Sequence, residues 1–137
     1  MLSRGFSLLE MVIVLLILGL LFGISYPIYT EQITRTRRLD GQMALLNFAS
    51  QMERHFAETQ RYDDNTALNI LGSEISPGKW YTLAIDTENT DSAHFRLLAI
   101  PRLRQASADI LCQTLTLNSV GEKGIQGGTA TAAELCW

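Results

Sequence analysis

Residues 5–24 read GFSLLEMVIVLLILGLLFGI, a long apolar run that one carboxylate, Glu10, interrupts near its start. A carboxylate at the centre of a membrane-spanning helix costs about 2.5–3.5 kcal/mol, so a glutamate in such a run requires an explanation. The run follows five residues, MLSRG, whose only charged side chain is Arg4. This arrangement constrains the rest of the chain, because the apolar run needs lipid or protein around it.

The position of the small residue Gly5 distinguishes this N-terminus from an ordinary secretory signal. Such a signal carries its small-residue cleavage site after the apolar stretch, whereas Gly5 precedes it. Cleavage between Gly5 and Phe6 would remove the charged leader, residues 1–5, and leave the apolar helix on the mature chain. The alternative is a plain membrane anchor with an incidental glutamate near its edge.

Gly5, Phe6 and Glu10, followed by the apolar run, resemble the class III signal of type IV prepilins and type II secretion pseudopilins. In that family a prepilin peptidase cuts after the glycine and methylates the new N-terminus. The resemblance implies cleavage between Gly5 and Phe6 and N-methylation of Phe6. It also implies that the Glu10 carboxylate pairs with the amino terminus of a neighbouring subunit during assembly.

The apolar stem, residues 6–28, is about 34 Å long as a helix, which is enough to span a bilayer. Gly19, Gly23 and Pro27 lie within it, and Pro27 predicts a kink or a loosened turn. Two interpretations of these three residues stay open. They let the stem unwind locally when it moves from membrane to filament, or they allow close packing between helices.

A second helical pattern continues directly from the stem. Between residues 33 and 59 there is no proline, and apolar residues recur at spacings of three or four, which predicts an amphipathic helix. The stripe comprises Leu39, Met43, Leu46, Ala49, Met52 and Phe56, widened by Leu45. One helix from Phe6 to about Thr59 would be roughly 80 Å long. Its own small domain cannot cover that length, so the N-terminal half must lie in lipid or against other copies.

The remaining chain predicts a small antiparallel sheet. A loop at residues 60–79, with one short helical turn at 66–71, precedes three strand patterns that form a meander over the helix. The expected strands are 80–86, 94–100 and 110–118, followed by a turn at 120–124 and a tail rich in Gly, Thr and Ala at 127–133. This is an α+β fold class.

Cys112 and Cys136 are the only cysteines. An even count after an export-type anchor indicates a disulfide in an oxidising compartment. It would close a loop of about 25 residues, which contributes roughly 3–3.5 kcal/mol. Two buried free thiols are the alternative. A zinc site is disfavoured because His55 and His94 lie far apart and no metal-ligand spacing is present.

The whole chain resembles the type IV pilin fold, with a long N-terminal helix, a variable loop, an antiparallel sheet and a C-terminal cysteine pair. Type II secretion major pseudopilins usually carry a calcium-binding loop instead, so the cysteines favour the pilus. Several motifs resemble minor pilins of the PilE type: Tyr26-Pro27-x-Tyr29, Arg37-Arg38-x-Asp40-Gly41-Gln42-x-Ala44-Leu45-Leu46, Met52-Glu53-Arg54, Cys112-x-Thr114-Leu115-Thr116-Leu117-x-Ser119-x-Gly121 and Cys136-Trp137.

The resemblance implies a leader at 1–5, a transmembrane and polymerisation helix at 6–28 and a globular head at 29–137. The expected function is that of a minor pilin, processed by prepilin peptidase and incorporated into the pilus or priming its assembly. Such a subunit supports pilus biogenesis, twitching motility, adhesion or DNA uptake. The alternatives are a type II secretion pseudopilin and a pilin that binds DNA or another ligand.

The implied partners are other pilin subunits through the N-terminal helix, prepilin peptidase, the inner-membrane assembly platform and the membrane. The positive-inside rule puts Arg4 in the cytoplasm and the residues after Tyr29 outside. The implied location is the inner membrane of a Gram-negative bacterium with the head in the periplasm, and later the extracellular pilus. No cofactor, metal or catalytic constellation is expected: Asp63, Asp64 and Asn65 lack the spacing of a calcium loop.

Two groups of arginines are candidate contact residues. Arg35, Arg37 and Arg38 follow the stem and predict a solvated face near lipid headgroups or a neighbouring subunit. The other group is a candidate patch for DNA or another ligand, although the net charge of −3 is unfavourable for general nucleic-acid binding. It comprises Arg96, Arg102 and Arg104, with His94 and Trp80 nearby. The alternative is scattered surface arginines balanced by acids.

Overall fold

The computed structural model describes residues 7–64, 70, 74–131 and 133–137. The chain divides into two compact units, an N-terminal unit, Met1–Ile33, and a head unit, Thr34–Trp137. Gly5 and Phe6, the expected cleavage pair, lie outside the described residues, as does almost all of the short helical turn expected at 66–71.

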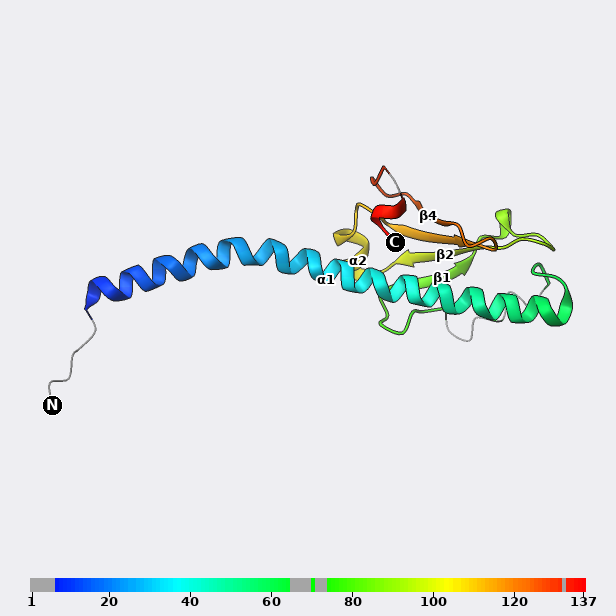
Figure 1. The fold of residues 1–137 in the computed structure, drawn as a ribbon, viewed down its shortest axis with the longest axis horizontal. Coiled ribbons are helices and arrows are strands. Elements are labelled where there is room, and N and C mark those ends of the chain that lie inside the picture. The colour runs from blue at the N-terminus through cyan, green and yellow to red at the C-terminus, as the bar shows by residue number, and fades with distance from the viewer. Residues whose placement is uncertain (1–6, 65–69, 71–73, 132) are drawn as a thin grey trace. The chain divides into compact units, whose positions relative to one another are not determined.

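Helix α1 spans Leu8–Thr59, so the expected end at Thr59 is confirmed. Pro27 lies inside α1, and the helix continues through it (Figure 1). The Thr30 hydroxyl donates a hydrogen bond of 2.9 Å to the Pro27 carbonyl. Pro27 therefore does not end the helix in this conformation, although it removes one backbone donor.

The predicted apolar stripe of α1 is half wrong. Leu45 and Met52 are buried, and Ala49 and Phe56 pack against the core, but Leu39, Met43 and Leu46 are 54, 70 and 50% exposed. The buried face instead comprises Arg38, Gly41, Ala44, Leu45, Phe48, Met52 and His55. Apolar spacing misplaced the face because two of its positions are polar. Both side chains hydrogen-bond to a carboxylate outside α1: Arg38 to Asp109 and His55 to Asp64.

Four antiparallel strands form one sheet in the order β1-β2-β3-β4. They are β1 (Tyr81–Ile85), β2 (Arg96–Pro101), β3 (Thr114–Asn118) and β4 (Lys123–Gln126). The three expected strands are confirmed, although β3 begins four residues later than expected. The fourth was missed because its glycine-containing sequence reads as a turn. Gly124 leaves room for its cross-strand neighbour, since a Cβ there would lie 2.5 Å from the Thr116 hydroxyl.

The short helix α2 (Leu103–Ala108) was also missed. It has six residues and begins two residues after Pro101, so it offers too little periodicity to detect. Two 3-10 turns, η2 (Thr87–Asn89) and η3 (Ala133–Leu135), complete the described elements.

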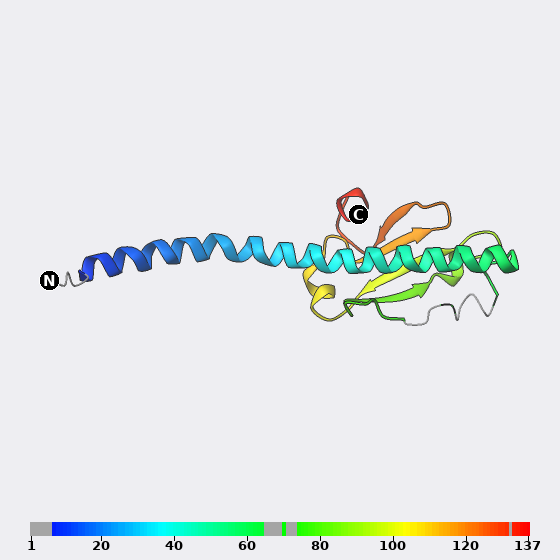
Figure 2. The same ribbon diagram turned by 60° about the horizontal axis from the view of Figure 1, so that its bottom comes forward.

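The core of the head unit lies between the second half of α1 and one face of the sheet, as Figures 1 and 2 show. Phe48 and Met52 of α1 meet Tyr81, Leu97 and Leu115 of the sheet, and all five are almost fully buried. The Cys112–Cys136 disulfide is confirmed, with the two Cα atoms 5.6 Å apart. It fixes the tail to the segment that leads into β3.

Candidate functional site

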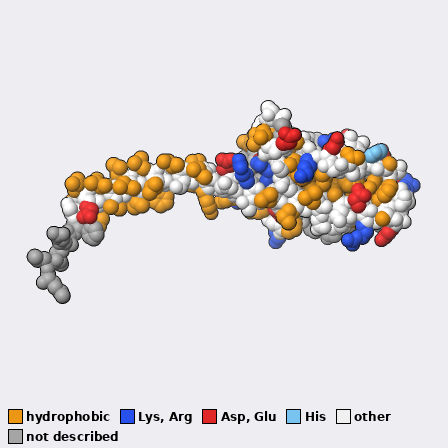
Figure 3. Space-filling model, in the orientation of Figure 1, with side chains coloured by type: hydrophobic (Ala, Val, Ile, Leu, Met, Phe, Trp, Pro, Cys, Tyr) orange, Lys and Arg blue, Asp and Glu red, His pale blue; other side chains and the backbone are white. Residues whose placement is uncertain are grey.

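The first part of α1 presents apolar side chains to its surroundings on every side. From Ser7 to Gln32 every described residue is exposed, and Glu10 is the only charged residue between Leu8 and Thr30. This helix is long and apolar enough to cross a membrane, and none of its most apolar window is buried (Figure 3). An uncovered apolar surface of this extent requires lipid or partner helices.

Gly19 and Gly23 have open space around them, since a Cβ at either position would meet no described atom within 4 Å. Packing within this chain therefore does not require glycine at either position. Helix unwinding and close approach of another helix both stay predictions for these two residues.

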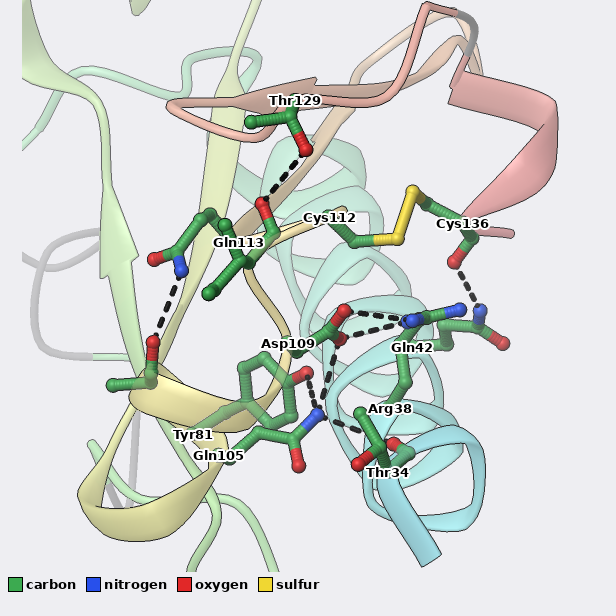
Figure 4. Close-up of polar contacts among 12 residues, drawn as sticks. Thr34, Arg38, Gln42, Tyr81, Gln105, Asp109, Cys112, Gln113, Thr129 and Cys136 are labelled. Carbon is green, nitrogen blue, oxygen red and sulfur yellow. Dashed lines mark hydrogen bonds and ion pairs between the residues drawn. A yellow bond between two sulfur atoms is a disulfide. The ribbon is translucent and has the colours of Figure 1, made fainter. Parts of the chain in front are cut away.

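A buried polar cluster joins α1 to α2 in the head unit (Figure 4). Arg38 donates two hydrogen bonds to the Asp109 carboxylate, Nε to Oδ2 at 2.8 Å and Nη2 to Oδ1 at 2.7 Å. Gln105 Nε2 lies 3.1 Å from Asp109 Oδ2, 3.1 Å from the Tyr81 hydroxyl and 3.2 Å from the Thr34 carbonyl. α2 is therefore fixed against the first residue of the head unit.

The predicted basic surface of Arg35, Arg37 and Arg38 is wrong in part. Arg38 points into the head unit, where it pairs with Asp109 and cannot serve as a solvated cation. The Arg37 guanidinium stacks over the Trp80 ring, 3.8 Å from its centroid. Only Arg35 and the edge of this stack remain on the surface, because successive residues of a helix point in different directions.

The predicted patch of Arg96, Arg102 and Arg104 also separates. Arg96 begins β2 and Arg102 follows its last residue, so their backbones lie about 20 Å apart. Asp86 lies 3.9 Å from Arg96, and Asp91 lies 3.2 Å from the neighbouring His94. Acidic residues therefore offset the positive charge at this end of the sheet.

Arg102 and Arg104 lie at the other end of β2, together with Trp80. The Arg102 amide donates a hydrogen bond of 2.8 Å to the Trp80 carbonyl. Lys79 and Leu103 join them, since both line a shallow hollow of about 600 Å³ with Arg102. We call Lys79, Arg102, Leu103 and Arg104 the α2 surface. The sequence patterns did not predict Lys79 and Leu103 as members of this surface. Their positions in the sequence, beside Trp80 and between the two arginines, were the signal that could have indicated them.

The α2 surface carries an excess of positive charge. Among the described residues, Lys79, Arg102 and Arg104 form no ion pair. The nearby Asp40 carboxylate accepts hydrogen bonds from the Ser76 hydroxyl and the Gly78 amide, so one carboxylate stands against three cations. The three cations are therefore available to an anionic ligand.

The carboxylates after α1 have local partners. Asp64 pairs with His55 at 2.9 Å, and Asp63 accepts hydrogen bonds from Arg61, which lower the pKa of the Asp63 carboxyl. No group of three or more potential metal ligands occurs within the described part of the chain. Asn65, the third member of the sequence cluster, lies outside the described residues.

A membrane-length apolar helix, an antiparallel sheet over its second half and a disulfide-closed tail define a pilin of the type IV class. Residues 1–26 match the prokaryotic N-terminal methylation motif. Residues 27–116 match the family described as type IV minor pilin ComP, DNA uptake sequence receptor. The chain belongs to that family, whose members are pilus subunits. Its apolar helix and methylation motif indicate membrane anchoring and a place in a pilus.

One sequence relative and one solved structure are similar to this chain. The chain is 31% identical over 93 residues to the type IV major fimbrial protein FimA of Dichelobacter nodosus, a match that covers 64% of this chain and 55% of FimA. It therefore spans about half the length of that relative. The Neisseria meningitidis non-core minor pilin PilV shares the fold, with a TM-score of 0.57 and 22% identity over 74% of this chain and 94% of PilV.

Proposed function

We propose that this minor pilin is cleaved between Gly5 and Phe6 and held in the inner membrane of a Gram-negative bacterium with its head in the periplasm. It is then incorporated into a pilus filament. The observation that supports this proposal is the uncovered apolar surface of the first part of α1, broken only by Glu10. Prepilin peptidase and the inner-membrane assembly platform are the partners that this route requires.

Glu10 is the proposed docking charge. In lipid a lone carboxylate is unfavourable, but in a bundle of stems it can pair with the positively charged amino terminus, Phe6, of a neighbouring subunit. Attraction in a low-dielectric setting offsets the desolvation of both charges only when they are close. The carboxylate therefore favours assembly with a defined offset between neighbouring helices.

Mass spectrometry of sheared, purified filaments tests this route. The expected result is a low-abundance chain that begins with N-methylated Phe6. A deletion strain scored for pili, twitching, DNA uptake and exoprotein secretion separates the pilus from the type II secretion alternative. Loss of secretion with normal pili would contradict the pilus proposal.

We further propose that the head binds DNA during uptake, as the description of its family says of a DNA uptake sequence receptor. The observation that favours this second function is the α2 surface, whose three cations have no described acidic partner. The Arg37–Trp80 stack lies beside it. Cations contact phosphates, and an aromatic–guanidinium stack suits contact with sugar or base.

Binding of the full-length protein in detergent to double-stranded DNA, titrated with salt, tests this function. Arg102→Gln with Arg104→Gln should weaken binding and reduce the slope of log K against log salt by about 2. Arg96→Gln is the matched control, because Arg96 lies at the opposite end of β2 beside Asp86, and it should leave the slope unchanged. Equal losses in both variants would contradict the assignment of DNA to the α2 surface.

A further inference from the structure

Contacts with DNA phosphates do not account for Leu103 at the tip of the α2 surface. Its side chain is 70% exposed, and its backbone has a φ of 52°, in the left-handed region that leucine disfavours. Asparagine or glycine adopts this conformation at lower cost. The head therefore exposes a large apolar side chain at a position where the backbone conformation favours asparagine or glycine.

The charged side chains nearest Leu103 in sequence and around its hollow are mostly positive, with the Asp40 carboxylate bound to Ser76 and Gly78 nearby. Arg102 and Arg104 flank it in sequence, and Lys79 lines the same hollow. An exposed apolar side chain with cations on both sides of it in sequence fits an interface whose outer layer is anionic and whose interior is apolar. A duplex exposes apolar surface only at thymine methyls and between unstacked bases, whereas a bilayer has a continuous apolar layer beneath its anionic headgroups. The pairing of Leu103 with cations therefore fits a lipid surface more simply than it fits DNA.

The position of α2 in the head unit supports a lipid partner. Gln105, two residues after Leu103, bonds the carbonyl of Thr34. Thr34 is only six residues after Ile28, the last residue of the expected membrane segment, and six extended residues span at most about 20 Å. The part of the head that carries Leu103 is therefore tethered within reach of the headgroup layer.

We propose that the α2 surface docks on the anionic headgroups of the membrane that anchors the stem, with Leu103 entering the apolar boundary. This inference rests on the proposed membrane-held precursor, and it shares Arg102 and Arg104 with the proposed DNA site. Lipid and DNA then compete for the same cations. The DNA site is covered while the subunit waits in the membrane and becomes free when the subunit enters the filament.

The full-length protein in lipid nanodiscs tests this docking through its two tryptophans. Trp80 adjoins the α2 surface, whereas Trp137 bonds the Gly124 carbonyl on β4, at the opposite edge of the sheet. Trp137→Phe leaves Trp80 as the reporter, and Trp80→Phe leaves Trp137. Nanodiscs contain brominated phosphatidylglycerol or brominated phosphatidylcholine, whose bromines quench nearby tryptophan.

Trp80 should be quenched about twofold or more strongly in the anionic nanodiscs, and high salt should remove the difference. Leu103→Asn, which suits the left-handed backbone, should lose this quenching without losing stability. Arg102→Gln with Arg104→Gln should lose it too. Arg96→Gln should retain the stronger Trp80 quenching in anionic nanodiscs. The Trp137 reporter should show no difference between the two lipids.

Equal Trp80 quenching in the two lipids, or anionic quenching that survives both the Leu103 and the double arginine variants, would overturn the docking. DNA affinity, measured in detergent and in anionic nanodiscs, separates the two proposals. Docking predicts weaker DNA binding in the nanodiscs and recovery with Leu103→Asn. DNA binding that depends on the arginines but not on lipid leaves the DNA site standing and rejects docking. Lipid-dependent quenching without DNA binding in detergent would support docking and reject the DNA site.

Discussion

Arg38 and Asp109 form a two-point ion pair inside the head unit, with N–O distances of 2.8 and 2.7 Å. The pair connects α1 to the residue that follows α2, and Asp109 is 1% exposed. Removal of one partner from such a pair leaves an uncompensated buried charge, which costs more than the intact pair contributes.

Asp109→Asn should therefore lower the free energy of unfolding by about 3–5 kcal/mol. Denaturant unfolding of the detergent-solubilised protein, followed by near-ultraviolet circular dichroism of the head, measures the change. Arg38→Met combined with Asp109→Leu should recover much of the loss, because neither charge then remains. A change below about 1 kcal/mol in Asp109→Asn would contradict a buried, coupled pair.

Gly41→Ala should destabilise the head. A Cβ at this position would lie 2.9 Å from the Tyr81 ring, in a packed part of the core. Overpacking of this kind costs about 1–3 kcal/mol, which exceeds or matches the gain of about 1 kcal/mol from the better helix propensity of alanine. Thermal unfolding of Gly41→Ala beside Gly23→Ala tests this. Gly23→Ala meets no described atom and should not lower the midpoint.

The Cys112–Cys136 disulfide should contribute about 3–3.5 kcal/mol, because it closes a loop of about 25 residues in the unfolded chain. Cys112→Ser with Cys136→Ser should lose that amount in denaturant unfolding. A reducing agent should shift the wild type by a similar amount and leave the double variant unchanged. Equal stability of the oxidised and reduced proteins would refute the contribution.

Stability should fall as the pH rises from about 10 to about 12. Burial is the main cause that raises the pKa of Tyr81 to about 12, and burial with a hydrogen bond to Glu53 does the same for Tyr62. In this window the unfolded chain has released protons that the folded chain still holds, so rising pH favours unfolding. Tyr62→Phe should show a shallower decline between pH 10 and 12. If stability declines equally in Tyr62→Phe and the wild type, ionisable groups other than Tyr62 cause the decline.

The sequence predicted the parts of the fold whose residues form regular patterns. The end of α1 at Thr59, three of the strands and the cysteine pair are confirmed. The buried face of α1 was misplaced because Arg38 and His55 lie on it, and polar residues do not register as core. Their partners, Asp109 and Asp64, are 71 and 9 residues away, so only the folded chain reveals the pairing.

The candidate contact surface was less predictable still. Arg96 and Arg102 are near in sequence, but a strand holds them apart, whereas Lys79 joins Arg102 through the pairing of β1 with β2. The left-handed backbone of Leu103 leaves no trace in the sequence. Such features depend on strand register and on backbone angles, which sequence patterns alone do not reveal.

Incorporation through the N-terminal helix is the central proposal for this pilin. Filaments sheared from strains that carry the wild type or Glu10→Ala, quantified against the membrane-held precursor, test it directly. Glu10→Ala should be cleaved and stable in the membrane but greatly reduced in filaments, because the docking charge for Phe6 is gone. Wild-type amounts of the cleaved Glu10→Ala chain in filaments would contradict this route of assembly.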